Sequence, residues 1–515
     1  MACRRPPGRP RPRPGDPARR AAPALARPLD GVRRDGRVRP GRPARAARPA
    51  SGGDPVTALH ELTAEAAAAE IRARRLSPVE LVDAVLDRIE WLDPALSCFV
   101  SVDAEAARAA ARAAEAAVVA GDELGALHGV PCSVKDLIDV QGLPTSRGAL
   151  PFAGRVAQAD APAATLVRRA GAICVGKTTT PEFGWSFVTS SPVSGSTVNP
   201  WCPTRTAGGS SGGAGAALAA GLGPLAVATD GGGSIRLPAA FTGVVGLKPT
   251  SGRVPTYPPS DLGTLGHLGP MARSVRDVAR LLDVLTGHTG SEPGPALRAC
   301  GRPVEHLRIG YAPTINGAPV DPEVREVVET WVADLVGAGV AVTAFDLVVD
   351  GVEDTWDRLY AQSIARQVDA LAPADRALLS PELRSFVDST RGLPRSAGPD
   401  AELARRAVVA QGDALLREYD LVITPTTSTV AFDAGLAHPG TVAGQPVGLT
   451  DWTRLTQVWN LTGFPAISLP AGTASDGLPV GVQVAGPPQG DGVLLALAAF
   501  AERALGPRLP ARVAG

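Results

Sequence analysis

Residues 208–236 read GGSSGGAGAALAAGLGPLAVATDGGGSIR and are the most informative segment of this 515-residue chain. They contain two glycine-rich clusters, 208–213 and 231–233, and the strand-like run 225–229 lies between them. Composition alone favours a flexible Gly/Ser linker, but each cluster is followed by apolar, patterned sequence. Three glycines ahead of Ser234 leave the backbone free to turn its N–H groups toward one point. Convergent donors of this kind are what a tetrahedral oxyanion requires.

Lysine is nearly absent from the chain. The 51 basic side chains comprise 48 arginines and three lysines, Lys135, Lys177 and Lys248. Arginine stays protonated in proteins, whereas a buried lysine can lose its proton and act as a base. Each lysine is therefore a candidate for a role that arginine cannot fill, and chance survival is the alternative.

These segments resemble the amidase signature family. Residues 208–250 are similar to the family's signature segment, and residues 129–136 (GVPCSVKD) to its catalytic-lysine segment. The spacing of 75 residues from Lys135 to Ser210, and of 24 from Ser210 to Ser234, is also that of the family. The resemblance extends over about residues 60–505, with further similar segments at 176–184, 199–201, 267–273 and 463–466.

The resemblance implies both a fold and a chemistry. The implied fold is α/β, a single large α/β/α domain around a mixed β-sheet. The implied reaction is hydrolysis of a carboxylic amide C–N bond through an acyl-enzyme, without metal or cofactor. Ser234 would be the acylated nucleophile, Ser210 a relay serine that follows a cis peptide bond, and Lys135 the base.

The same resemblance implies that the backbone N–H groups of Gly231, Gly232, Gly233 and Ser234 form the oxyanion hole. General chemistry agrees with such a site, because a desolvated, neutral lysine can activate a serine through a bridging hydroxyl. No histidine is needed, and the six histidines show no metal-binding spacing. The chain departs from the family at Cys202, where Asp is common, and at Gly231, where a bulkier residue is frequent. Neither departure removes a catalytic group.

Three other functions are compatible with parts of the sequence. Residues 171–178 fit the P-loop pattern of nucleotide hydrolases, although the four residues between its glycines are apolar. Residues 208–212 fit the nucleophile elbow of α/β-hydrolases, which would make Ser210 the nucleophile of an esterase, with His438 as a candidate base. The third is the A subunit of a tRNA-dependent amidotransferase complex. The short connection 401–419 favours a stand-alone amidase over this third function.

Residues 1–55 differ in composition from the remainder. They contain 15 arginines, no lysine and four acidic residues, and they lack hydrophobic periodicity. We therefore predict a disordered Arg/Pro-rich extension at 1–55 and an amidase domain at 56–515. Strands are predicted at 130–140, 172–176, 225–229, 307–311, 340–347, 421–425, 466–469 and 480–484, and helices at 77–91, 103–120 and 274–285.

The sequence also limits which binding partners and which cellular compartment we expect. It contains no run of about 18 apolar residues, so we expect no membrane span. A mildly acidic body gives no reason to expect nucleic acid. No apolar signal segment follows the arginine pairs near the start, and six scattered cysteines favour reduced thiols, so a cytoplasmic location is predicted. A homodimer is compatible with the sequence, although nothing in it requires one.

The substrate is expected to be a small-molecule amide. The sequence does not identify the residues of its pocket, but the variable loops 183–194, 257–267 and 451–460 are the candidates. Their aromatic side chains favour an apolar acyl or aryl group, and ordinary core packing is the alternative for each of them.

Overall fold

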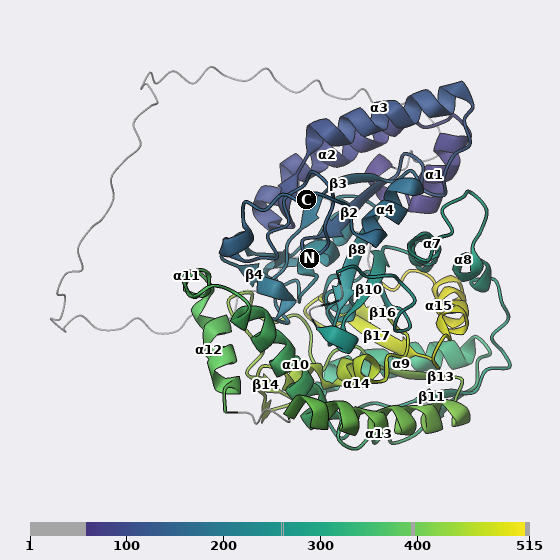
Figure 1. The fold of residues 1–515 in the computed structure, drawn as a ribbon. Helices are drawn as coiled ribbons and strands as arrows, with labels where there is room; N and C mark the ends of the chain where they lie inside the picture. Colours follow the sequence, from purple (N-terminus) through teal and green to yellow (C-terminus); the bar gives the residue numbers. More distant parts are fainter. Residues whose placement is uncertain (1–57, 259, 261, 393–396, 510–515) are drawn as a thin grey trace, which may run out of the picture. The chain divides into compact units, whose positions relative to one another are not determined.

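The structure is a computed structural model that describes residues 58–258, 260, 262–392 and 397–509, so the predicted extension at 1–55 lies outside the described residues. The described chain is built around one 11-stranded β-sheet (Figure 1). Across the sheet the strands are β1 (Phe99–Val102), β3 (Ile173–Thr178), β2 (Pro131–Lys135), β8 (Leu225–Asp230), β10 (His267–Ala272), β9 (Val245–Lys248), β16 (Ala466–Thr473), β17 (Pro479–Ala485), β13 (Leu421–Pro425), β11 (Ile309–Tyr311) and β12 (Val342–Ala344).

The sheet mixes parallel and antiparallel pairs. Strands β3, β2 and β8 pair in parallel, and so do β13, β11 and β12. From β8 through β10, β9, β16 and β17 to β13 every pair is antiparallel, and β1 is antiparallel to β3. The predicted mixed sheet is therefore confirmed.

Helices cover both faces of this sheet. In β8, Leu225 and Val227 belong to one hydrophobic cluster, whereas Ala226 and Ala228 belong to another, because alternate side chains of a strand point to opposite faces. The first cluster includes residues of α1 (Ala64–Arg72), α4 (Pro162–Arg169), α7 (Val275–Leu285), α8 (Pro295–Ala299), α9 (Pro322–Gly337) and α15 (Asp491–Leu505). The second includes α5 (Gly212–Ala219) and α6 (Arg236–Thr242).

The layer that contains α5 and α6 extends along the sheet in both directions. On one side, α2 (Pro78–Leu96) and α3 (Ala104–Ala120) lie side by side (Figure 1). Their buried side chains pack against those of α5 and β3. On the other side, α6 packs in a cluster that includes α10 (Val352–Asp369), α12 (Pro381–Thr390), α13 (Ala397–Glu418) and α14 (Arg454–Thr462). The remaining elements of the described residues are α11 (Pro373–Arg376), five short 3-10 helices, and the hairpin strands β4 (Ser190–Ser191), β5 (Gly195–Ser196), β6 (Val198–Asn199), β7 (Cys202–Thr206), β14 (Thr441–Val442) and β15 (Gln445–Pro446). The predicted α/β/α architecture is thus observed.

The small residues of the 212–221 segment have a packing reason. All eight residues of α5 are buried. A Cβ at Gly215 would lie 2.8 Å from Thr242 Oγ1, and one at Gly213 would lie 2.5 Å from Thr179 N. Only a helix without side chains at these points can approach its neighbours so closely.

Several element boundaries differ from the prediction. The strand predicted at 130–140 ends at Lys135, because Ile138 N donates to Lys135 O and closes a turn. The helix predicted to end near 91 continues through Pro94 to Leu96. Strands β1, β9 and β10 were not predicted, and β10 carries Pro270, a residue that usually argues against a central strand.

Two further observations bear on the sequence-based expectations. None of the helices in the described ranges has both the length and the apolar character that crossing a bilayer requires. In the same ranges, the thiols of Cys98, Cys132, Cys174 and Cys300 are free.

Candidate active site

The three lysines are all fully buried. Lys177, on β3, forms an ion pair with Asp136 at 3.4 Å and also donates to Thr145 Oγ1 at 2.8 Å. Lys248, on β9, donates to Pro249 O at 3.2 Å. Lys135 differs from both, because its contacts are with serine hydroxyls.

Lys135 ends β2 and reaches the first glycine-rich cluster. Its Nζ donates to Ser210 Oγ at 2.7 Å and to Ser211 Oγ at 2.8 Å. Ser211 Oγ in turn donates to Thr229 O at 3.2 Å, so its single hydrogen is already engaged. Because the Ser211 hydrogen is engaged, the Ser210 hydroxyl is the one of the two whose proton can pass to the Lys135 amine. The peptide bond between Gly209 and Ser210 is cis, as the resemblance implies.

The surroundings of Lys135 disfavour its charged form. Burial lowers the pKa of Lys135 well below its ordinary value, and the nearby Asp230 carboxylate opposes this shift without cancelling it. A neutral amine has a lone pair that can accept a proton. The shift therefore favours the neutral form of Lys135, which is the form that a general base requires.

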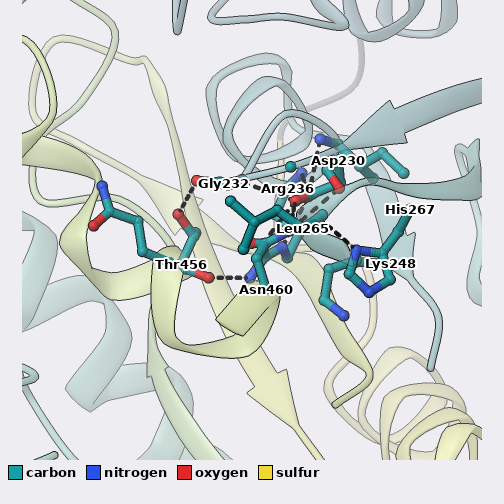
Figure 2. A network of polar contacts seen from close by, with 12 residues as sticks. Asp230, Gly232, Arg236, Lys248, Leu265, His267, Thr456 and Asn460 are labelled. Carbon is teal, nitrogen blue, oxygen red and sulfur yellow. Dashed lines mark hydrogen bonds and ion pairs between the residues drawn. The ribbon is translucent and has the colours of Figure 1, made fainter. Parts of the chain in front are cut away.

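The second glycine-rich cluster is organised by Asp230, the last residue of β8 (Figure 2). Its carboxylate accepts hydrogen bonds from Gly233 N at 2.8 Å and Ile235 N at 3.1 Å, and it pairs with the Arg236 guanidinium at 2.8 and 2.9 Å. Asn460 Nδ2 donates to the same carboxylate at 2.9 Å. Although burial alone would raise the pKa of Asp230, Arg236 and Asn460 hold it well below its ordinary range. Asp230 is thus the charged anchor of the turn.

Ser234 lies at the end of this turn and beside the first cluster. Ser211 N donates to Ser234 O at 3.1 Å, which joins the two glycine-rich segments directly. The Ser234 side chain makes no hydrogen bond with any residue in the described ranges, and it remains slightly exposed. Gly233 N–H is engaged by Asp230. The N–H groups of Gly231, Gly232 and Ser234 make no hydrogen bond within the described chain, so they are available to a ligand.

A cavity adjoins the site through Thr229 and Asp230. Neither Ser210 nor Ser234 lines it. Two of the three loops predicted to form the pocket contribute to its wall, 183–194 through Phe183 and 257–267 through several residues, whereas 451–460 contributes none. The lining residues that carry apolar or aromatic side chains include Leu137, Ile138, Ala161, Pro162, Phe183, Tyr257, Leu262 and Leu268.

Comparison with known proteins gives a consistent result. The family model described as Amidase matches residues 80–495. The chain belongs to the amidase signature family. It is 35% identical over 459 residues to an acylamidase of Rhodococcus erythropolis, with 86% of this chain and 95% of that relative covered.

The chain is also similar to an amidotransferase subunit and to a solved amidase structure. The chain is 36% identical over 463 residues to the A subunit of the glutamyl-tRNA(Gln) amidotransferase of Symbiobacterium thermophilum, with 83% of this chain and 93% of that relative covered. Among solved structures, a bacterial aryl acylamidase of the amidase signature family superposes with a TM-score of 0.79 at 28% identity, covering 87% of this chain and 96% of that one. The chain is thus an enzyme that hydrolyses amide C–N bonds, and the predicted family, fold and activity are confirmed.

In this amidase, neither the P-loop pattern at 171–178 nor the nucleophile-elbow pattern at 208–212 forms the site that it would predict. The P-loop pattern at 171–178 lies largely in β3, where Lys177 is buried against Asp136 and Thr145, so it is not a glycine-rich turn that opens a helix. For the nucleophile elbow, His438 Nδ1 accepts from Gly440 N within its own turn. Ser210 instead contacts Lys135.

Several groups at the site could not be identified from the sequence. Ser211 is a second partner of Lys135, and the Asp230 carboxylate accepts the N–H groups of the turn. Trp356 and Thr456, which contact the same turn, are far away in the chain. The only sequence signal for Asp230 and Ser211 is their position inside the two glycine-rich clusters, and Trp356 and Thr456 have none.

Proposed function

We propose that Ser234 is the nucleophile, Ser210 the proton relay and Lys135 the base of amide hydrolysis. Neutral Lys135 takes the proton of Ser210 as Ser210 takes that of Ser234, and Ser234 Oγ then attacks the amide carbonyl carbon. The proton returns by the same route to the leaving nitrogen as the C–N bond breaks. A water molecule, activated by the same groups, hydrolyses the acyl-enzyme to a carboxylate.

The observation that carries this proposal is the contact of Lys135 Nζ with Ser210 Oγ at 2.7 Å, in a setting that lowers the pKa of the lysine. A base must lie within hydrogen-bond reach of the proton that it removes, and about 2.6–3.2 Å is the usual range. The link from Ser211 N to Ser234 O supports the placement of Ser234 beside this pair.

We propose that the oxyanion hole uses the N–H groups of Gly231, Gly232 and Ser234. All four N–H groups from Gly231 to Ser234 were expected to contribute. The bond from Gly233 N to Asp230 favours a different role for that group, because a donor engaged by a buried carboxylate is not free for the substrate oxygen.

We propose an amide with an apolar acyl or aryl group as substrate. The apolar side chains of the cavity wall support this choice, and so does the similarity of the chain to an acylamidase and to an aryl acylamidase. A Cβ at Gly231 would lie 2.2 Å from Leu262 Cδ1, so Leu262 covers the place where relatives often carry a larger side chain. The proposal can be tested by measuring how fast the purified protein hydrolyses aryl amides, long-chain alkyl amides and short aliphatic amides. A preference for the short aliphatic amides would contradict it.

We propose that the chain works as a stand-alone amidase in the cytoplasm, with residues 56–515 as the catalytic domain. The similarity to the A subunits of amidotransferases makes a partner-dependent activity the second candidate. The purified protein should hydrolyse simple amides without any added protein. Activity that appears only with partner proteins and a charged tRNA would favour the second candidate.

Covalent labelling tests the nucleophile directly. A serine-directed phosphonate should form an adduct on Ser234 that peptide mass spectrometry locates. Ser234→Ala should abolish the adduct, and Ser210→Ala should slow its formation while leaving it on Ser234. An adduct on Ser210 would refute the assignment and favour the nucleophile elbow.

A further inference from the structure

The carbonyl groups of the glycine turn are held by side chains from two distant helices. Trp356 Nε1, on α10, donates to Gly231 O at 3.2 Å. Thr456 Oγ1, on α14, donates to Gly232 O at 2.6 Å, a bond that Figure 2 shows. The turn is therefore bonded on its carbonyl side by groups that the proposed mechanism does not use.

The hydrogen bonds to the carbonyl groups also determine which way the N–H groups of the turn point. The cis peptide bonds of the described chain are Gly209–Ser210 and Tyr257–Pro258, so the peptides of the turn are trans. In a trans peptide the C=O and the following N–H point in opposite directions. Because Gly231 O points at the Trp356 indole, the Gly232 N–H points away from it.

Trp356 is itself fixed. It is fully buried, its ring stacks on Tyr360 with centroids 4.5 Å apart, and Phe187 lies against it at 5.9 Å. A Cβ at Gly232 would lie 2.4 Å from Trp356 Cζ2, so the indole packs directly against the turn. An indole held in this way can hold the peptide that it bonds.

The two helices that supply these donors are also joined to each other. Arg454, on α14, forms two hydrogen bonds to the carboxylate of Asp357, on α10, at 3.1 and 3.0 Å. Asp357 follows Trp356 in sequence, and Arg454 lies two residues before Thr456. The bidentate pair therefore fixes the donors relative to one another.

We propose that Trp356 is a positioning residue of the oxyanion hole. Its indole N–H fixes Gly231 O and thereby aims the Gly232 N–H at the oxygen of the tetrahedral intermediate. Thr456 orients the next peptide in the same way and presents Gly233 N–H to Asp230. This inference rests on the proposed function. Because the oxyanion forms only along the reaction path, Trp356 supports kcat more than substrate binding.

Trp356→Phe tests the inference, because it keeps an aromatic ring and removes the N–H donor. We expect kcat to fall about tenfold, which is less than the ~10²–10³ for losing an oxyanion donor outright. KM should change less than about twofold, and affinity for a boronic acid transition-state analogue should fall in step with kcat/KM. Thr456→Val should lower kcat in the same way, and Thr456→Ser should restore most of it.

The matched control is Trp459→Phe. Trp459 is buried, and its Nε1 has no hydrogen-bond partner in the described chain, so the same substitution removes no bond. Its kcat should stay within about twofold of that of the parent enzyme. The inference is overturned if Trp356→Phe keeps the parent kcat, or if both variants lose kcat equally. Failure of the proposed function is separate, because it would appear as turnover by Ser234→Ala.

Discussion

Asp230→Asn should destabilise the protein strongly, because it removes one charge of a fully buried ion pair. The native carboxylate accepts Gly233 N, Ile235 N and Asn460 Nδ2 and pairs twice with Arg236. The amide that replaces it presents an NH₂ group to a site that supplies only donors, and it leaves the guanidinium without a counter-charge. Breaking a buried pair in this way costs about 3–5 kcal/mol. That is a large fraction of the roughly 5–15 kcal/mol that stabilises most proteins.

Urea titration at neutral pH, followed by circular dichroism, measures the loss. Asp433→Asn is the matched control, since Asp433 pairs with Arg205 at 2.9 Å at the surface, and its loss should cost at most about 1 kcal/mol. Because Arg236 holds the pKa of Asp230 below its ordinary value, the pair stabilises the fold above about pH 4 and loses this effect as the pH falls. The reasoning is refuted if the two variants unfold at the same urea concentration.

Three further outcomes are expected. Ser211→Ala should lower kcat less than Ser210→Ala, because Ser211 donates its hydrogen to a carbonyl and cannot pass it to Lys135; equal losses in steady-state assays would contradict the relay assignment. Burial and the Arg236 guanidinium lower the pKa of Lys248 to about 7, so the folded state binds fewer protons than the unfolded state between about pH 7 and 10.4. Stability should therefore rise with pH in that window, and Lys248→Met should remove this rise in denaturation curves. A protein that starts at Val56 should match the full chain in melting temperature and turnover, and a clear loss of either would show that residues 1–55 contribute.

The candidate catalytic residues are easier to find in the sequence than the residues that surround them. Lys135, Ser210 and Ser234 stand out because each lies in a short motif, and the Arg bias of the chain draws attention to its lysines. Trp356 and Thr456 do not stand out, because they contact the turn only after the chain has folded back on itself. No local pattern carries contacts between residues so distant in sequence.

The secondary structure also shows that local sequence patterns miss features that depend on distant contacts. Strands that are rich in apolar residues, such as Leu421–Pro425, were predicted correctly. Strand β10 was missed because Gly269 and Pro270 are residues that local propensity places outside strands, and only pairing with β8 and β9 makes them extended. The turn after Lys135 was missed because the alternation of apolar residues continues beyond it, to Val140.

The turnover of Lys135→Arg as a function of pH tests the central claim most directly. A neutral base cannot be replaced by a permanently charged guanidinium, so kcat/KM should fall on the order of 10²–10⁴, as far as in Lys135→Ala. In the parent enzyme kcat/KM should rise with pH along a limb whose pKa lies below the ordinary lysine value. Lys177→Arg is the matched control, because that buried lysine pairs with Asp136 and should retain turnover per folded molecule. An active Lys135→Arg enzyme with an unchanged pH limb would contradict the account.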